Sequence, residues 1–259
     1  MAYKYNRSLP YKPGQDEPFK VSRSKIELYT QCPRCFWLDV RLKITRPSSP
    51  PFQINKAIDQ LYKKEFDAYR KSATPHPIMK LHGIKAVPFK HKDMEVWRAN
   101  FTGVSTLHKA TNLHVFGAVD DIWVNEDDEL IIVDYKATSK NAEVNLDALW
   151  QNMYKRQMEI YQWLFRQNGF KVSKTGYFVY TNARQDLDVF EDKLVFKTKL
   201  IPHEGDDSWI DGAIKKMKKV MDGDMPAVGT AAMGGPCEHC EYARRRTELT
   251  LKHLKDKKS

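Results

Sequence analysis

Two neighbouring apolar segments, each carrying an aspartate, constrain this chain more than any other feature. Residues 117–122 read Gly-Ala-Val-Asp-Asp-Ile, and residues 129–136 read Glu-Leu-Ile-Ile-Val-Asp-Tyr-Lys. Every second side chain of a β-strand lies on the same face, so Asp134 and Lys136 should lie together. Charged groups at the end of an apolar strand are costly to bury unless a partner such as a metal ion uses them.

The polar residues 125–128, between these segments, predict the loop of a β-hairpin. Antiparallel pairing across that loop would bring Asp120 and Asp134 together near its far end, whereas Asp121 would face the opposite side. Two carboxylates from adjoining strands, with a lysine beside them, can hold a divalent cation for phosphodiester hydrolysis. The alternative is a surface ion pair between Asp134 and Lys136, which would contribute little stability.

A helix is predicted over residues 147–167, where apolar residues recur near the helical period. Asp147 can cap its beginning and Gly169 fits its end. Gln157 and Tyr161 are four residues apart, so they share one face of this helix. That face can lie over the predicted metal site. The alternatives are a solvated position for Gln157 and ordinary core packing for Tyr161.

In this order, the segments resemble the RecB-like branch of the PD-(D/E)XK nuclease superfamily. The similar motifs are Gly117-x-Val119-Asp120, Asp134-Tyr135-Lys136, Gln157-x-x-x-Tyr161 and, near the N-terminus, residues 24–34, which read Ser-Lys-Ile-Glu-Leu-Tyr-x-x-Cys-Pro-Arg. The resemblance runs over roughly residues 22–243. The branch includes CRISPR-adaptation exonucleases and the nuclease domains of recombination helicases.

The resemblance implies a restriction-endonuclease-like α/β core, a mixed central β-sheet flanked by helices, that binds Mg²⁺ or Mn²⁺ and cuts DNA. It implies that Asp120 and Asp134 are metal ligands and that Lys136 orients the attacking water or stabilises charge on phosphorus. Gln157 and Tyr161 would position the DNA strand. The expected enzyme is a deoxyribonuclease, exonuclease or endonuclease, of DNA repair, recombination or defence. Its expected partners are single-stranded DNA or duplex ends and a helicase, recombination or defence protein.

The chain departs from this branch at one position. The branch often carries a metal-binding histidine on a helix before the first aspartate, and the corresponding predicted helix, residues 52–70, has none. Asn55 or Asp59 could replace it with an oxygen ligand, which suits Mg²⁺ and Mn²⁺, and Glu65 is a further acid. The missing histidine motivates a second hypothesis, a catalytically impaired nucleic-acid-binding module that retains the nuclease fold. A protein-interaction module clasped by a metal would leave the Asp-x-Lys strand unexplained.

The 4 cysteines form two Cys-x-x-Cys pairs, Cys32 with Cys35 and Cys237 with Cys240. Two such pairs predict a four-thiolate metal site that clasps the two ends of the chain, and closing so long a loop should stabilise the fold. The resemblance favours a [4Fe–4S] cluster, whereas the division of the cysteines into two and two resembles a structural Zn²⁺ site. Unmetallated or disulfide-bonded cysteines are the remaining alternative. His239, between two ligands, is expected to be a bystander.

The charge of the chain favours a polyanionic partner. Its 43 lysines and arginines exceed its 33 acids by 10, and a basic surface attracts nucleic acid. We expect a flexible arm over residues 1–20, a nuclease-like domain over 21–243 and a basic tail over 244–259. The chain lacks an apolar run of transmembrane length and a signal peptide, and its cysteines are of the metal-binding type. These features predict a cytoplasmic protein that does not contact membranes.

The other predicted elements alternate without a clean βαβ series, so a mixed α/β core is expected. They are helices from Ser22 to the first cysteine pair, over residues 52–70 and over 206–221, and strands over residues 82–89, 175–181 and 190–201.

Overall fold

The computed structural model describes residues 9–47 and 52–257, which form two compact units. The first unit contains residues 9–47, 107–113 and 211–257 of the described chain, and the second contains residues 52–106 and 114–210. The predicted division into residues 1–20, 21–243 and 244–259 rests on composition and motifs, whereas the two units are defined by packing. The predicted division therefore stays a prediction.

The second unit is built on a five-stranded sheet in the order β2-β5-β6-β7-β8. Its strands are β2 (Ala86–Pro88), β5 (Asp121–Asn125), β6 (Leu130–Thr138), β7 (Thr175–Ala183) and β8 (Phe196–Glu204). Strands β6 and β7 are parallel, and the other three neighbouring pairs are antiparallel. The sheet is therefore mixed.

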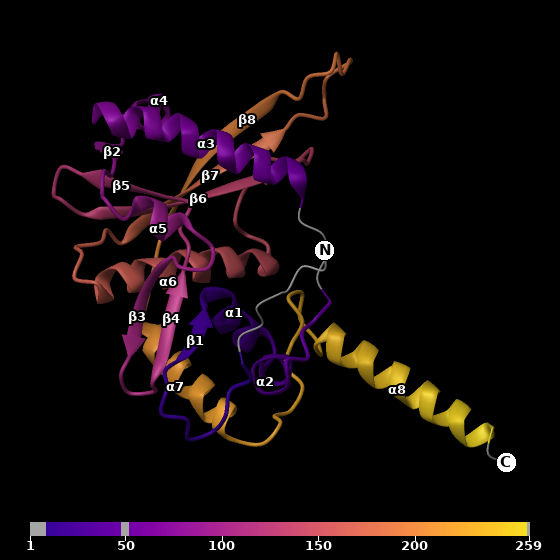
Figure 1. The fold of residues 1–259 in the computed structure, drawn as a ribbon. Helices are drawn as coiled ribbons and strands as arrows, with labels where there is room; N and C mark the ends of the chain where they lie inside the picture. The colour runs from indigo at the N-terminus through magenta and orange to yellow at the C-terminus, as the bar shows by residue number, and fades with distance from the viewer. Residues whose placement is uncertain (1–8, 48–51, 258–259) are drawn as a thin grey trace, which may run out of the picture. The chain divides into compact units, whose positions relative to one another are not determined.

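Two helices of this unit, α3 (Gln53–Ser72) and α6 (Asn152–Gln167), lie on opposite faces of the sheet (Figure 1). The alternation of β6 explains this arrangement, because Val133 and Tyr135 pack in one apolar cluster with Phe66 of α3. Asp134 instead contacts Gln157 of α6. The predicted fold class, an α/β protein with a mixed sheet flanked by helices, is confirmed.

The shorter elements of the second unit are α4 (Pro77–Leu81), α5 (Met94–Arg98) and the 3₁₀ turn η1 (Leu149–Gln151). Strands β3 (Val104–His108) and β4 (Leu113–Gly117) belong to a smaller three-stranded sheet, and the boundary between the units runs through both.

Two predicted strands begin and end elsewhere than the sequence indicates. Only residues 86–88 of the predicted strand 82–89 form β2, because helix α4, with a proline in its first turn and His76 as its cap, ends at Leu81. The predicted strand 190–201 begins at Phe196 as β8.

The predicted strand 117–122 is interrupted in the structure. Strand β4 ends at Gly117 and β5 begins at Asp121, so Asp120 lies in the connection between them. In this connection the backbone N–H of Val119 donates to the carbonyl oxygen of Trp97 at 3.1 Å, which satisfies it outside the sheet.

The predicted helix 147–167 begins later than expected. Asp147 does not cap it. Gln151, in the preceding turn η1, accepts from the backbone N–H of Ala148 at 3.0 Å and donates to the carbonyl oxygen of Asn145 at 2.8 Å. Gly169, with φ of 83°, follows the end of α6 as predicted.

The first unit contains β1 (Phe19–Ser22), α1 (Arg23–Gln31), α2 (Pro33–Leu42), α8 (Glu238–Asp256) and most of α7 (Ser208–Asp222). Part of the predicted arm is packed here, since Tyr11 is buried and its hydroxyl donates to Asp222 at 2.6 Å.

Most of the predicted basic tail is helical. Residues 244–256 belong to α8, which has no buried residue. Ion pairs one turn apart on its surface, such as Arg244 with Glu248 at 2.7 Å, support the helix. Among the described helices, none is long and apolar enough to cross a membrane.

Candidate active site and cysteine site

Asp134, Lys136 and Gln157 form one contact group on the α6 face of the sheet. The carboxylate of Asp134 is fully buried and accepts hydrogen bonds from Nζ of Lys136 and, at 2.6 Å, from Nε2 of Gln157. The prediction that Asp134 and Lys136 share a face is thus confirmed. Asp134 and Lys136 do form the ion pair considered as the alternative, but this pair does not lie on the surface, because the Asp134 side chain is buried and the Lys136 side chain is only 14% exposed.

The aromatic ring of Tyr154 covers this group. Nζ of Lys136 lies 4.7 Å from the ring centroid, and the negative charge of Asp134 adds to burial in raising the pKa of Tyr154. Tyr154 lies three residues before Gln157, so helical spacing alone places both on one face. Tyr161 is buried one turn beyond Gln157, and its role in positioning DNA stays a prediction.

Asp120 lies beside the peptide that follows Asp134. Its Oδ2 atom accepts from the backbone N–H of Tyr135 at 2.9 Å, and its Oδ1 atom lies 3.9 Å from Nζ of Lys63 on α3. The Asp120 side chain is about a quarter exposed, at 25%. Asp120 and Asp134 therefore approach the same stretch of β6, and one of them reaches solvent.

Helix α3 brings a third carboxylate to Asp120. Nζ of Lys63 donates to Oδ2 of Asp59 at 2.9 Å. Burial and the negative charge of Asp120 together raise the pKa of Asp59. A carboxylate whose pKa is raised by the charge of a neighbouring carboxylate is an arrangement that a divalent cation relieves, and hard carboxylate oxygen atoms suit Mg²⁺ or Mn²⁺.

The other candidates on α3 lie differently. Nδ2 of Asn55 donates to the carbonyl oxygen of Ala137 at 3.5 Å, so Asn55 borders the end of β6. Glu65 pairs with Nε2 of His76 at 2.9 Å. Sequence reasoning missed Lys63, although its spacing of four residues from Asp59 is a known signal for an ion pair on a helix.

Asp121 lies on the α3 face of the sheet, opposite to Asp134, as predicted. Its fully buried carboxylate accepts from Arg70, from Nη2 of Arg98 at 2.9 Å and from the hydroxyl of Tyr135 at 2.7 Å. Burial and the charge of Asp121 hold the pKa of Tyr135 well above its ordinary value. Because Tyr135 also binds Asp120 through its backbone, this cluster fixes the two strands that carry the candidate site.

Asp121→Asn should lower the free energy of unfolding by about 3–5 kcal/mol, because it removes the buried counter-charge of two guanidinium groups, which then keep only more exposed acidic partners such as Asp67. Urea denaturation followed by circular dichroism measures this change. Asp127→Asn, in the exposed hairpin loop, is the matched control and should change stability by less than about 0.5 kcal/mol. Equal stability of the two variants would contradict the assigned role of Asp121.

The four cysteines meet within the first unit. Their sulfur atoms all lie within 4.8 Å of one another. Among the described residues, this is the one group of three or more Cys, His, Asp or Glu residues that could hold a metal ion together. Sγ–Sγ distances of 3.7 Å for Cys32–Cys240 and for Cys35–Cys237, and 3.5 Å for Cys35–Cys240, exclude disulfide bonds in this structure. The geometry suits thiolate ligation of a metal.

Local structure positions these sulfur atoms. Cys32 and Cys237 precede the first turns of α2 and α8, and Cys35 and Cys240 follow within those turns. Backbone N–H groups of Cys35 and Gly229 donate to Cys32 at 3.5 and 3.3 Å. Burial raises the pKa of Cys32, but these hydrogen bonds, together with those from the thiols of Cys35 and Cys240, outweigh it and bring the pKa to about 7. Gly229 is required there, since a Cβ atom would lie 2.5 Å from Cα of Cys32.

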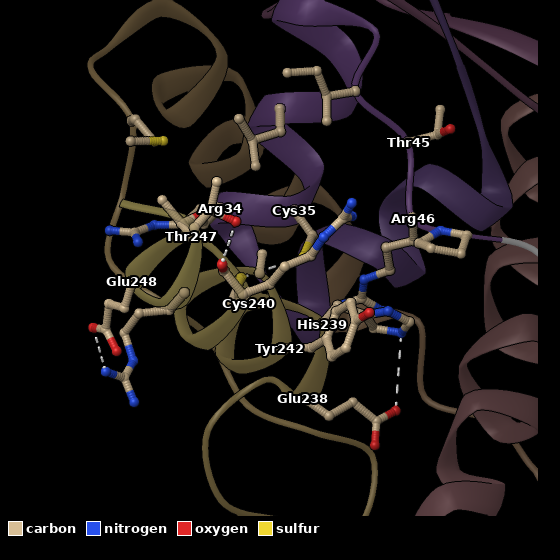
Figure 2. Close-up of a pocket in the computed structure, with 18 of the residues that line it drawn as sticks. Arg34, Cys35, Thr45, Arg46, Glu238, His239, Cys240, Tyr242, Thr247 and Glu248 are labelled. Carbon is tan, nitrogen blue, oxygen red and sulfur yellow. Dashed lines mark hydrogen bonds and ion pairs between the residues drawn. The ribbon is translucent and has the colours of Figure 1, made fainter. Parts of the chain in front are cut away.

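A cavity of about 1270 Å³ opens beside these sulfur atoms, between α2, the segment after it and α8 (Figure 2). Cys35 and Cys240 line it, together with Arg34 and Arg46. Burial raises the pKa of both Cys35 and Cys240. The charge of Arg46 opposes that effect at Cys35.

Comparison with known proteins decides the family. A model of the PD-(D/E)XK nuclease superfamily matches residues 55–245, which is more than half of the chain. The chain belongs to the PD-(D/E)XK nuclease superfamily. The matched range includes every residue of the acidic site and the second cysteine pair.

One solved structure similar to this PD-(D/E)XK chain is titled "Crystal structure of SSO0001". It shares 20% sequence identity with a TM-score of 0.35, and the match covers 82% of this chain and 80% of that chain. No curated protein matches the chain. Membership of the superfamily implies a metal-dependent nuclease that acts on nucleic acid.

Proposed function

We propose that this chain is a Mg²⁺- or Mn²⁺-dependent deoxyribonuclease of the RecB-like branch, acting in DNA repair, recombination or defence. One observation carries the proposal: the buried Asp134 is held between Lys136 and Gln157, and the partly exposed Asp120 lies on the adjoining peptide. The proposed substrates are single-stranded DNA and duplex ends, and the net charge of +10 supports a polyanionic substrate. A helicase, recombination or defence protein is the proposed partner.

The residues divide into three roles. Asp120 and Asp134 would hold the metal, which would activate water and neutralise the scissile phosphate. The Lys136 ammonium, nearly enclosed by Asp134 and Tyr154, would orient the water or stabilise charge on phosphorus, where low solvation strengthens its effect. Gln157 fixes the orientation of the Asp134 carboxylate through its 2.6 Å hydrogen bond, and Tyr161 would position the strand.

The activity test uses purified protein with labelled single-stranded DNA, duplex DNA and RNA, each with Mg²⁺, Mn²⁺ or EDTA. We expect metal-dependent cleavage of DNA and none in EDTA. Stepwise shortening of the labelled DNA from one end, without internal cuts, would identify an exonuclease. Tight DNA binding with no cleavage under either metal would reject the nuclease assignment.

The second candidate function is a catalytically impaired nucleic-acid-binding module. A specific observation favours it: Lys63 already pairs with Asp59, and Lys136 already pairs with Asp134. Any divalent cation must compete with these ammonium groups. The binding-only outcome of the activity test would support this candidate.

Asp59 is proposed as the oxygen ligand that replaces the histidine of the branch. Because the pKa of Asp59 is raised in the folded state, its ionised form costs stability at every pH above the folded pKa. Asp59→Asn removes this cost, so the free energy of unfolding at pH 7 should stay equal or rise. Mn²⁺ affinity, measured by calorimetric titration, should fall by about tenfold or more.

Glu65→Gln is the matched control for Asp59→Asn, because Glu65 lies on the same helix but pairs with His76. It should leave Mn²⁺ affinity unchanged. Equal Mn²⁺ affinity of Asp59→Asn and the wild type would remove Asp59 from the proposed ligands.

The cysteine site is proposed to hold a metal that stabilises the first unit. The resemblance favours a [4Fe–4S] cluster. The sulfur spacing instead supports a single Zn²⁺, since four thiolates at about 2.3 Å from one ion lie about 3.8 Å apart. A brown protein that absorbs at about 400 nm would identify the cluster. A colourless protein that contains one zinc per chain would identify a zinc site. Reduced, metal-binding cysteines support a cytoplasmic location.

A further inference from the structure

The guanidinium of Arg46 lies against the four-cysteine site. Its Nη2 atom donates to Sγ of Cys237 at 3.3 Å, and its Nη1 atom donates to Oε1 of Gln31 at 2.8 Å. Gln31 in turn donates from Nε2 to Oε1 of Glu27, a buried residue, at 3.0 Å. This chain of hydrogen bonds holds the guanidinium in one orientation toward the sulfur.

The negative charge of the site favours a positively charged partner. Four thiolates carry four negative charges, and a divalent metal centre neutralises only two of them. Cys32, Cys35 and Cys237 are buried, where an uncompensated charge is costly. A guanidinium that donates to an ionised sulfur both neutralises charge and forms a charge-assisted hydrogen bond, which is stronger than a neutral one.

Arg46 itself gives up solvation in this position. Among the described residues, its Nε atom has no hydrogen-bond partner and is buried. An arginine that served only as a charged surface residue would keep its Nε atom in contact with water. The contact with Cys237 offsets the loss.

We propose that Arg46 is the counter-charge of the four-thiolate site and sets how tightly the site holds its metal. The inference rests on the part of the proposed function that gives the cysteines a metal, and it is independent of the nuclease activity. Arg46 binds no metal itself. It acts through Cys237 and is a positioning residue.

Arg34 provides a matched control. It lines the same cavity as Arg46 and Cys240 (Figure 2). Its Nε atom, however, donates to the carbonyl oxygen of Pro226 at 2.8 Å. Replacing either arginine removes one positive charge from the cavity, but only Arg46 donates to a sulfur atom in the hydrogen bonds described above.

The test compares full-length wild type, Arg46→Ala, Arg46→Lys and Arg34→Ala, each as purified. Chelator is titrated into each protein, and the zinc or iron released is quantified. Arg46→Ala should release half of its metal at a chelator concentration about 10–100-fold lower than the wild type, as is usual when an outer partner of a metal ligand is lost. Arg46→Lys should show a smaller change, because it keeps the charge but loses the planar fork. Arg34→Ala should match the wild type.

Each result bears on the proposal. Purification of Arg46→Ala without metal, beside loaded Arg46→Lys and Arg34→Ala, would support it. Equal release from Arg46→Ala and wild type, or equal shifts in Arg46→Ala and Arg34→Ala, would overturn it. A wild type that contains no metal would overturn both this inference and the metal assignment of the cysteines, and DNA cleavage by the same sample would show that the nuclease assignment stands.

Discussion

Asp134→Asn should reduce the rate of DNA cleavage by about 10³-fold or more while DNA binding is retained, because removal of one essential group of a catalytic set has an effect of this size. The substitution keeps the shape of the side chain and an oxygen for the hydrogen bond from Gln157. It removes the negative charge that would hold the cation and that pairs with Lys136. Single-turnover cleavage of end-labelled DNA gives the rate, and fluorescence anisotropy gives the affinity.

Two further variants sharpen this prediction. Asp188→Asn changes an exposed aspartate of the β7–β8 loop and should cleave DNA as the wild type does. Lys136→Ala should also cleave DNA about 10³-fold or more slowly than the wild type, because it removes another group of the same catalytic set. A folded Asp134→Asn protein that retains more than about a tenth of the wild-type rate would contradict the assigned role.

Cys32→Ser should lower the thermal unfolding temperature of the metal-loaded protein by about 10 °C or more. In a chain of this size, each kcal/mol lost from the free energy of unfolding lowers that temperature by about 2–4 °C. Structural zinc binding contributes about 10–16 kcal/mol to the folding of small metal-binding peptides. Here the metal would link sulfur atoms whose residues are 208 positions apart in the chain, Cys32 and Cys240. Loss of one thiolate opens that link. Calorimetry with metal analysis measures both effects.

His239→Ala is the control for the cysteine variant. His239 lies between Cys237 and Cys240 in the sequence, but it is not in the group of clustered ligands. It should leave the metal content and the unfolding temperature unchanged. Equal unfolding temperatures for Cys32→Ser and wild type would contradict a stabilising metal at the cysteines.

The parts of the site that depend on one regular element could be predicted from the sequence. Alternation along a strand predicts that Asp134 and Lys136 lie on one face of the sheet. A separation of four residues predicts that Gln157 and Tyr161 lie on one face of the helix. The cysteine cluster was predictable for a different reason, since paired thiols have few uses in a reduced chain other than metal binding.

The remaining contacts depend on how elements meet in space. Arg46 reaches Cys237 across 191 positions of sequence, and Arg98, at the end of helix α5, reaches Asp121 at the start of strand β5. No local pattern distinguishes these arginines from the other basic residues of a chain with 43. The break at Asp120 was missed because the apolar pattern continues across the connection between β4 and β5, where Val119 is buried outside either strand.

The most direct test of the nuclease assignment is a crystal structure of the protein soaked in Mn²⁺, with anomalous scattering used to locate the ion. The nuclease assignment predicts an anomalous peak for an ion bound by carboxylate oxygens of Asp120 and Asp134, with the Lys136 ammonium moved from Asp134 but still beside the ion. Mn²⁺ that is absent from these two aspartates at saturating concentration would contradict it.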